Sequence, residues 1–152
     1  MRFMMLMIPK GYEAAAPGTV PDAKAVEAMM KYNESLQKAG VLLSLDGLHP
    51  PSMGARVSFA GGKPKVTDGP FPEAKEVVGG YWMIRVKSRQ EAIEWASRCP
   101  GSENETIEIR QVQEMEDFPP DVKKAAAKFP AMQQSGARKG PAQARGKHRQ
   151  KV

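Results

Sequence analysis

The sequence predicts an α+β fold: a split βαβ pattern of the ferredoxin-like kind with a β-hairpin inserted in its middle. Three observations predict it. Residues 2–8 and 81–86 are apolar on both faces of a strand. Two segments with helix start and stop signals follow the first and third of the main strands. A Gly-Gly pair separates two short strand-like segments between them.

The first half of the domain is predicted to run strand, loop, helix, strand. Side chains of residues 2–8 alternate between two apolar faces, and a loop rich in Pro and Gly follows. Asp22 is placed to cap a helix that Gly40 ends. The apolar stripe of this helix is imperfect, because Asn33 occupies one of its positions. A second strand is expected over residues 41–45.

The inserted hairpin is predicted from residues 55–60 and 63–67, on either side of Gly61 and Gly62. Two-residue hairpin turns need positive φ values, which glycine adopts without strain. Pro64 cannot donate to a ladder, so its strand is expected at a sheet edge.

The second half is predicted to run strand, helix, strand. After residues 81–86, Ser88 and Glu91 have the spacing of a capping box. Pro100 ends the helix. The last strand, residues 106–113, alternates Ile with charged residues and so has one wet face. Val112 breaks that alternation, which predicts a bulge.

This arrangement leaves one face of the sheet in need of a cover. The two strands with apolar residues on both faces are the central ones in this topology, and two helices cover only one face. Either a second copy packs sheet against sheet, or the loops at residues 9–21 and 48–55 fold over the face. We expect the homodimer, since a large exposed apolar patch marks an interaction site.

Charge divides the 152 residues into two parts. Residues 1–116 hold 14 basic and 15 acidic side chains, whereas residues 117–152 hold 9 basic and 2 acidic ones. We therefore expect one domain over residues 1–116 and a basic, mostly disordered tail over 117–152, with no apolar period beyond Gln133. Such a tail is either a solvated extension or a weak, non-specific contact for nucleic acid phosphates.

Composition also limits location and cofactors. No apolar run reaches the roughly 20 residues that span a bilayer, and the apolar start is too short for a signal peptide, so we expect a cytoplasmic protein without membrane contact. Cys99 is the single cysteine, and no metal-ligand spacing or nucleotide-binding glycine loop is present. Neither a metal nor a cofactor is expected, and Cys99 fits a buried apolar position.

The candidate catalytic residues are Asp68 and His49. Asp68 ends a strand against Gly69 and Phe71, where a desolvated carboxylate can act as an acid or base; the alternative is a turn residue capping local amides. His49 is the only histidine of the domain; the alternative is an ordinary surface loop residue. We expect both side chains at one cleft, roughly 3 to 6 Å apart, as an acid/base pair. The candidate ligand-binding residues are Arg56, Gly69, Phe71, Tyr81 and Trp82.

The segment Val66-Thr67-Asp68-Gly69-Pro70-Phe71-Pro72-Glu73-Ala74-Lys75-Glu76, followed by Gly79-Gly80-Tyr81-Trp82, resembles the YCII-related proteins of the DGPF subgroup. The resemblance extends through Tyr32-Asn33-Glu34-Ser35-Leu36, Gly47-Leu48-His49-Pro50, Glu91-Ala92-Ile93-Glu94-Trp95 and Ile107-Glu108-Ile109-Arg110. It implies a bacterial, cytoplasmic protein with the fold of a dimeric α+β barrel. Many such proteins carry a histidine on the first helix paired with an aspartate, and Met29 holds that position here.

Two classes of function follow from these observations. One branch resembling this family removes chloride from a chlorinated hydroxyquinol, which favours a small-molecule-binding dimer or an enzyme with an acid/base pocket around Asp68. Proteins of the DGPF type are also commonly encoded beside extracytoplasmic-function sigma factors. The alternative is therefore a non-enzymatic regulatory protein that binds such a sigma factor. An enzyme or binder needs a concave pocket, whereas an interaction module needs none.

Overall fold

The main sheet of the protein has four antiparallel strands. A computed structural model describes residues 1–133, and its first unit is Met1–Val112. The strands are β1 (Arg2–Pro9), β2 (Leu42–Gly47), β5 (Gly80–Arg85) and β6 (Glu105–Gln111). Their order is β2-β5-β1-β6, so β1 and β5 are central, as expected from their two apolar faces. The predicted α+β fold class is confirmed, with the strand order of a split βαβ domain.

Both helices begin at the caps that the sequence indicates. In α1 (Ala23–Lys38), Asp22 Oδ1 accepts a hydrogen bond from the Ala25 amide at 2.9 Å. In α2 (Arg89–Ser97), Ser88 Oγ accepts one from the Glu91 amide at 3.1 Å. The Glu91 carboxylate reaches one residue further back than a capping box requires and accepts from the Lys87 amide at 2.8 Å. These bonds satisfy amides that a helix start leaves without partners.

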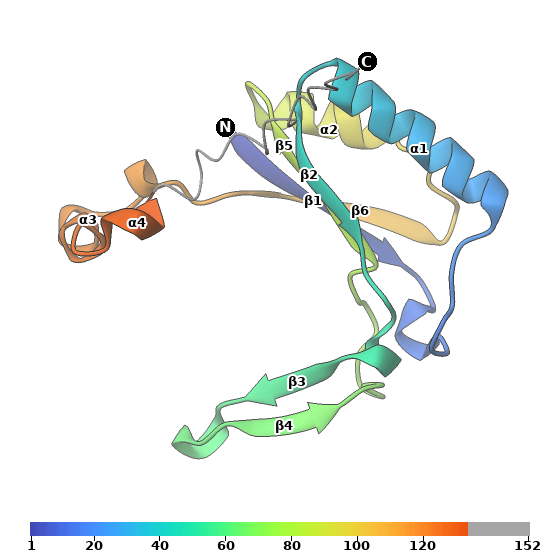
Figure 1. Ribbon diagram of the computed structural model, residues 1–152, viewed down its shortest axis with the longest axis horizontal. Coiled ribbons are helices and arrows are strands. Elements are labelled where there is room, and N and C mark those ends of the chain that lie inside the picture. The colour runs from blue at the N-terminus through green and yellow to red at the C-terminus, as the bar shows by residue number, and fades with distance from the viewer. Residues whose placement is uncertain (134–152) are drawn as a thin grey trace, which may run out of the picture. The chain divides into compact units, whose positions relative to one another are not determined.

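The core lies between the helices and one face of the sheet, and both helices cover that same face (Figure 1). Its members are buried apolar side chains of β1, β5, α1 and α2, with one residue just before β2 and one just after β5. They are Phe3, Met5, Met7, Tyr32, Leu36, Val41, Trp82, Ile84, Val86 and Ala92. Asn33, the polar exception in the helix stripe, accepts a hydrogen bond from Trp82 Nε1 at 2.7 Å. The exception therefore has a physical reason, because a buried indole N–H needs an acceptor.

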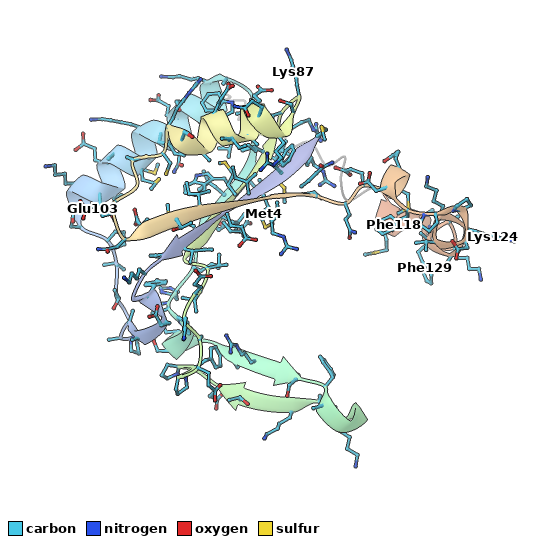
Figure 2. All side chains as sticks on the ribbon, turned by 180° about the vertical axis from the view of Figure 1, so that it is seen from behind. Met4, Lys87, Glu103, Phe118, Lys124 and Phe129 are labelled. Carbon is cyan, nitrogen blue, oxygen red and sulfur yellow. The ribbon has the colours of Figure 1, made fainter. Side chains whose placement is uncertain are left out.

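The opposite face of the sheet carries apolar side chains that stay half-exposed. They are Met4, Leu6 and Ile8 on β1 with Tyr81 and Met83 on β5; Met4 is labelled in Figure 2. On the two outer strands the same face is polar, with Ser44 and Asp46 on β2 and Thr106, Glu108 and Arg110 on β6. We call this surface the open face. Its apolar middle and polar margins follow from the strand order.

The hairpin forms a sheet of its own, made of β3 (Ala55–Ser58) and β4 (Lys65–Asp68). Gly61 and Gly62 have positive φ values of 74° and 77°, as predicted. The prediction of a two-residue turn is wrong, however, because the last pair of the ladder is Ser58 with Lys65. The residues between them form a short helical turn, in which the Gly62 amide donates a hydrogen bond to the Phe59 carbonyl. Pro64 precedes β4, where no ladder donor is needed.

The strand irregularity lies elsewhere than expected. The β1–β6 register runs without a shift, and the Val112 amide donates to the Arg2 carbonyl at 2.9 Å, so the bulge predicted at Val112 is wrong. A register shift is found instead in β2, between Leu42 and Ser44. Leu42 pairs with Ile84 and Leu45 with Trp82, both core residues, so the shift keeps Leu42 and Leu45 on the helix-covered face.

The second unit begins at Gln113, and its described residues, 113–133, include the short helices α3 (Pro120–Ala126) and α4 (Pro130–Gln133). Both helices lie in the part that the sequence predicts as a mostly disordered tail. Proline at a first helical position is already in helical geometry, which favours the start of α3 at Pro120. The disorder predicted beyond Gln133 concerns residues that lie outside the described ones. Within residues 1–133, no helix is long and apolar enough to cross a membrane.

Candidate functional site

A cleft of about 430 Å³ lies in the first unit, where the chain enters and leaves the hairpin. One wall is the segment between β2 and β3, and the other is the segment between β4 and β5. The lining residues are His49, Pro50, Pro51, Met53, Gly54, Ala55, Arg56, Phe71, Glu76, Val77 and Val78. We call this the hairpin cleft. Its size falls within the range of small-molecule sites.

Hydrogen bonds over long sequence distances fix the first wall. The Leu48 carbonyl accepts from the Tyr12 hydroxyl at 2.7 Å, and the Leu48 amide donates to the Gly79 carbonyl at 2.9 Å. Ser52 donates its hydroxyl to the Ala15 carbonyl at 3.0 Å. Pro50 is fully buried. Because these bonds hold the wall from both sides, the cleft is formed before any ligand arrives.

Gly69 joins the two walls. Its amide donates to the Gly54 carbonyl at 2.8 Å. A Cβ atom at this position would lie 1.7 Å from the Pro51 carbonyl oxygen, far inside contact distance. Only glycine therefore allows the two segments to approach this closely. Gly69 is not among the lining residues, and its predicted role in ligand binding stays a prediction.

Arg56 and Phe71 form the cationic part of the cleft. The Arg56 guanidinium carbon lies 4.1 Å from the centre of the Phe71 ring, which is a cation–π contact. Such stacking uses the flat face of the guanidinium and leaves its N–H edges for an acceptor. Across residues 1–133, no hydrogen bond or ion pair to Arg56 is found. The structure thus brings together three predicted site residues, His49, Arg56 and Phe71.

Asp68 lies beside this cleft and not in its lining. In the hairpin ladder Asp68 pairs with Ala55, which does line the cleft. The side chain of Asp68 is exposed, as is that of His49, so neither is desolvated by the described chain. The acid/base pair of Asp68 and His49 stays a prediction.

Tyr81 and Trp82, on β5, are not among the residues that line the cleft. Their side chains lie on opposite faces of the sheet, because neighbouring strand residues point to opposite faces. Trp82 belongs to the core, edge-to-face with Tyr32 at 5.8 Å between ring centres. Tyr81 lies on the open face, where its hydroxyl donates to Asp46 Oδ2 at 2.6 Å. That hydrogen bond to a carboxylate raises the pKa of Tyr81 above its ordinary value.

A second depression, of about 360 Å³, lies between α2 and β6 and contains Cys99. Burial, with a smaller effect of Glu105, raises the pKa of the Cys99 thiol to about 11. Cys99 packs against the core, and its Sγ lies 3.9 Å from the sulfur of Met29. Met29, where the family resemblance led us to expect a histidine, likewise packs against the core. In the described part of the chain, no three His, Cys, Asp or Glu residues are grouped as metal ligands would be.

Sequence reasoning missed several residues of the cleft, notably Glu76, Met53 and the pair Val77-Val78. A signal was present, because the segments flanking the hairpin are rich in Pro and Gly and carry isolated apolar residues. Loops of this kind, held by a rigid scaffold, commonly form binding sites. Their pairing across the cleft depends on hydrogen bonds that no local pattern reveals.

The strand order, the helices on one face and the inserted hairpin define an α+β domain of the split βαβ class with a cleft at the base of the hairpin. The YCII-related domain matches residues 1–116, and the chain belongs to this family. No curated protein matches the sequence. The DGPF subgroup, the sigma-factor association and the nucleic acid contact of the tail stay predictions.

Proposed function

We propose that this YCII-related protein is a homodimer that binds a small molecule in the hairpin cleft. The observation that carries the proposal is the stacked Arg56 guanidinium beside His49 in a cleft of ligand size. Polar groups at few points within mostly apolar walls are typical of small-molecule sites. Catalysis by Asp68 is not part of the proposal, because this carboxylate does not line the cleft.

The binding proposal is tested by adding a set of small fragments of mixed charge to the isotopically labelled protein and following its amide signals. We expect at least one fragment to shift the signals of Met53, Ala55 and Val77 together, since these residues share the cleft. Arg56→Gln should weaken this response, whereas Arg89→Gln, at an exposed arginine of α2 outside the cleft, should not. Fragments that shift only other regions would contradict the proposal.

The open face supports the dimer. Its middle is apolar and half-exposed, and its margins are polar, which is the anatomy of a protein interface. Charges along the strands also differ. On this face, one row of paired residues across the sheet ends in Asp46 on β2 and Glu108 on β6. Along the strands, the next row of this face contains Arg110 on β6, and the row after it contains Arg85 on β5. A two-fold axis between two sheets, perpendicular to the strands, would bring acidic and basic ends together.

Sedimentation of designed variants tests the dimer. Leu6→Asp places a charge in the apolar middle of the open face and should yield monomers at micromolar concentration. Met30→Asp is the matched control, since Met30 is 59% exposed on α1 and should tolerate the charge. Asp46→Arg and Arg85→Asp should each weaken the dimer, and the two together should restore it. A parent protein that is monomeric at this concentration would overturn the dimer.

A further inference from the structure

The charged groups of the hairpin cleft limit which ligand it can take. Of its lining residues, Arg56 carries a guanidinium, Glu76 a carboxylate and His49 an imidazole. No ion pair within residues 1–133 neutralises Arg56, so the guanidinium edges are open to an outside acceptor. A planar guanidinium binds a carboxylate through two parallel hydrogen bonds. The cleft therefore holds one strong position for an anion.

The proline-rich wall of the cleft contributes few backbone amides to anion binding. Pro50 and Pro51 have no amide hydrogen. The amides of Met53 and Gly54 already donate to the carbonyls of Pro50 and Pro51, each at 2.9 Å. Phosphate sites in proteins commonly use several free amides at a helix start or a nest. Residues 50, 51, 53 and 54 of the proline-rich wall therefore offer no free amide, and the guanidinium of Arg56 is the charged anion donor of the lining.

Glu76 lowers the charge that the cleft can accept. A doubly charged phosphate would meet this carboxylate in the same lining, and like charges at short range are unfavourable. A singly charged group satisfies Arg56 with less repulsion. The remaining lining is apolar, from Phe71, Met53, Val77 and Val78, and favours a ligand with an apolar body.

We infer that the ligand of the hairpin cleft is a monocarboxylate on a compact apolar body, held by Arg56 where it stacks on Phe71. This inference rests on the proposed binding function and specifies its ligand class. The carboxylate lies at the guanidinium edge and the apolar body lies against the valine and methionine side chains.

Four probes that share one ring test the ligand class: benzoate, benzyl alcohol, benzylamine and phenyl phosphate. Each is titrated into the labelled full-length protein, and the amide signals of Met53, Ala55 and Val77 report binding. We expect benzoate to bind at least tenfold more tightly than the other three. Arg56→Gln should reduce benzoate affinity at least tenfold and Arg56→Lys less so, because lysine keeps the charge and loses the two-bond geometry. Arg89→Gln, on the exposed side of α2 and outside the cleft, should leave the affinity unchanged.

The possible outcomes separate this inference from the proposed function. If benzyl alcohol binds as tightly as benzoate, the inference of a carboxylate ligand is wrong, while the proposal that the hairpin cleft binds a small molecule holds. Tightest binding of phenyl phosphate would replace the monocarboxylate by a phosphoester, again at the same cleft. If none of these probes shifts the cleft signals although other fragments do, the ligand class alone falls. If no small molecule of any charge shifts them, the binding function falls as well.

Discussion

The hydrogen bond between Trp82 and Asn33 gives the sharpest test of the core. Asn33→Ala removes the acceptor 2.7 Å from an indole nitrogen whose side chain is only 5% exposed. A buried donor without a partner costs about 1–3 kcal/mol. Asn33 is half-buried, so water reaches part of the site. We therefore expect a cost in the lower half of this range, about 1–2 kcal/mol. Alanine is the better helix former by up to about 0.7 kcal/mol, which offsets part of this loss.

Urea unfolding followed by circular dichroism measures the effect, with a net loss of about 0.5–1.5 kcal/mol expected in the free energy of unfolding. In a Trp82→Phe background the donor is absent, so Asn33→Ala should cost nothing and can stabilise slightly. The difference between the two backgrounds isolates the hydrogen bond. Glu34→Ala on the same helix is the control, since its exposed ion pair with Lys38 contributes at most about 0.5 kcal/mol. Equal effects of Asn33→Ala in both backgrounds would refute the reasoning.

Three further predictions concern the core, the thiol and the contact between the cleft walls. Ile84→Ala leaves a cavity at a fully buried position and should lower the free energy of unfolding by about 2–5 kcal/mol. Phe59→Ala is the control, because this side chain is 72% exposed and its loss should change the free energy of unfolding by less than about 0.5 kcal/mol. Similar losses for the two variants would contradict the assigned core. Burial raises the pKa of Cys99 to about 11, so at pH 8 the native protein should react with iodoacetamide more slowly than the urea-unfolded protein. The reaction rate of the native protein should rise as the pH approaches 11. Equal rates for native and unfolded protein at pH 8 would contradict the raised pKa. Gly69→Ala should lower Tm and shift the cleft amide signals, because the added methyl group would clash with the Pro51 carbonyl. Gly47→Ala is the control, since its methyl group meets nothing within 4 Å and should leave Tm and the signals unchanged. An unaltered Tm for Gly69→Ala would contradict the close approach of Gly69 to Pro51.

Local signals explain why so much of the main fold was predictable. Asp22 and Ser88 cap their helices through bonds within three residues, and the alternation in β1 and β5 reports which side chains share a face. Apolar residues on both faces also identified the central strands, because an outer strand of an antiparallel sheet needs no second apolar face. These properties belong to short segments, so the sequence alone was sufficient for them.

The hairpin turn shows where short-range reasoning reaches its limit. The positive φ values of Gly61 and Gly62 were predictable from residue type. The ladder nevertheless stops at Ser58 and Lys65, and a helical turn fills the space between the strands. Register depends on which cross-strand pairs form, and the four pairs here, from Ala55 with Asp68 to Ser58 with Lys65, join residues that are all exposed, so no buried face of the hairpin indicates the register in the sequence.

The α+β class, the central strands and the helix caps follow from the sequence alone, which also indicated His49, Arg56 and Phe71 as candidate site residues. The folded structure is needed to show that these three line one cleft, that Asp68 lies beside it, and that Trp82 belongs to the core with Asn33 as its hydrogen-bond acceptor. The physical reason is the range of the forces involved. Caps and strand alternation act over a few residues, whereas the cleft depends on contacts such as Tyr12 with Leu48 and Gly69 with Gly54, which form only when the whole chain has folded.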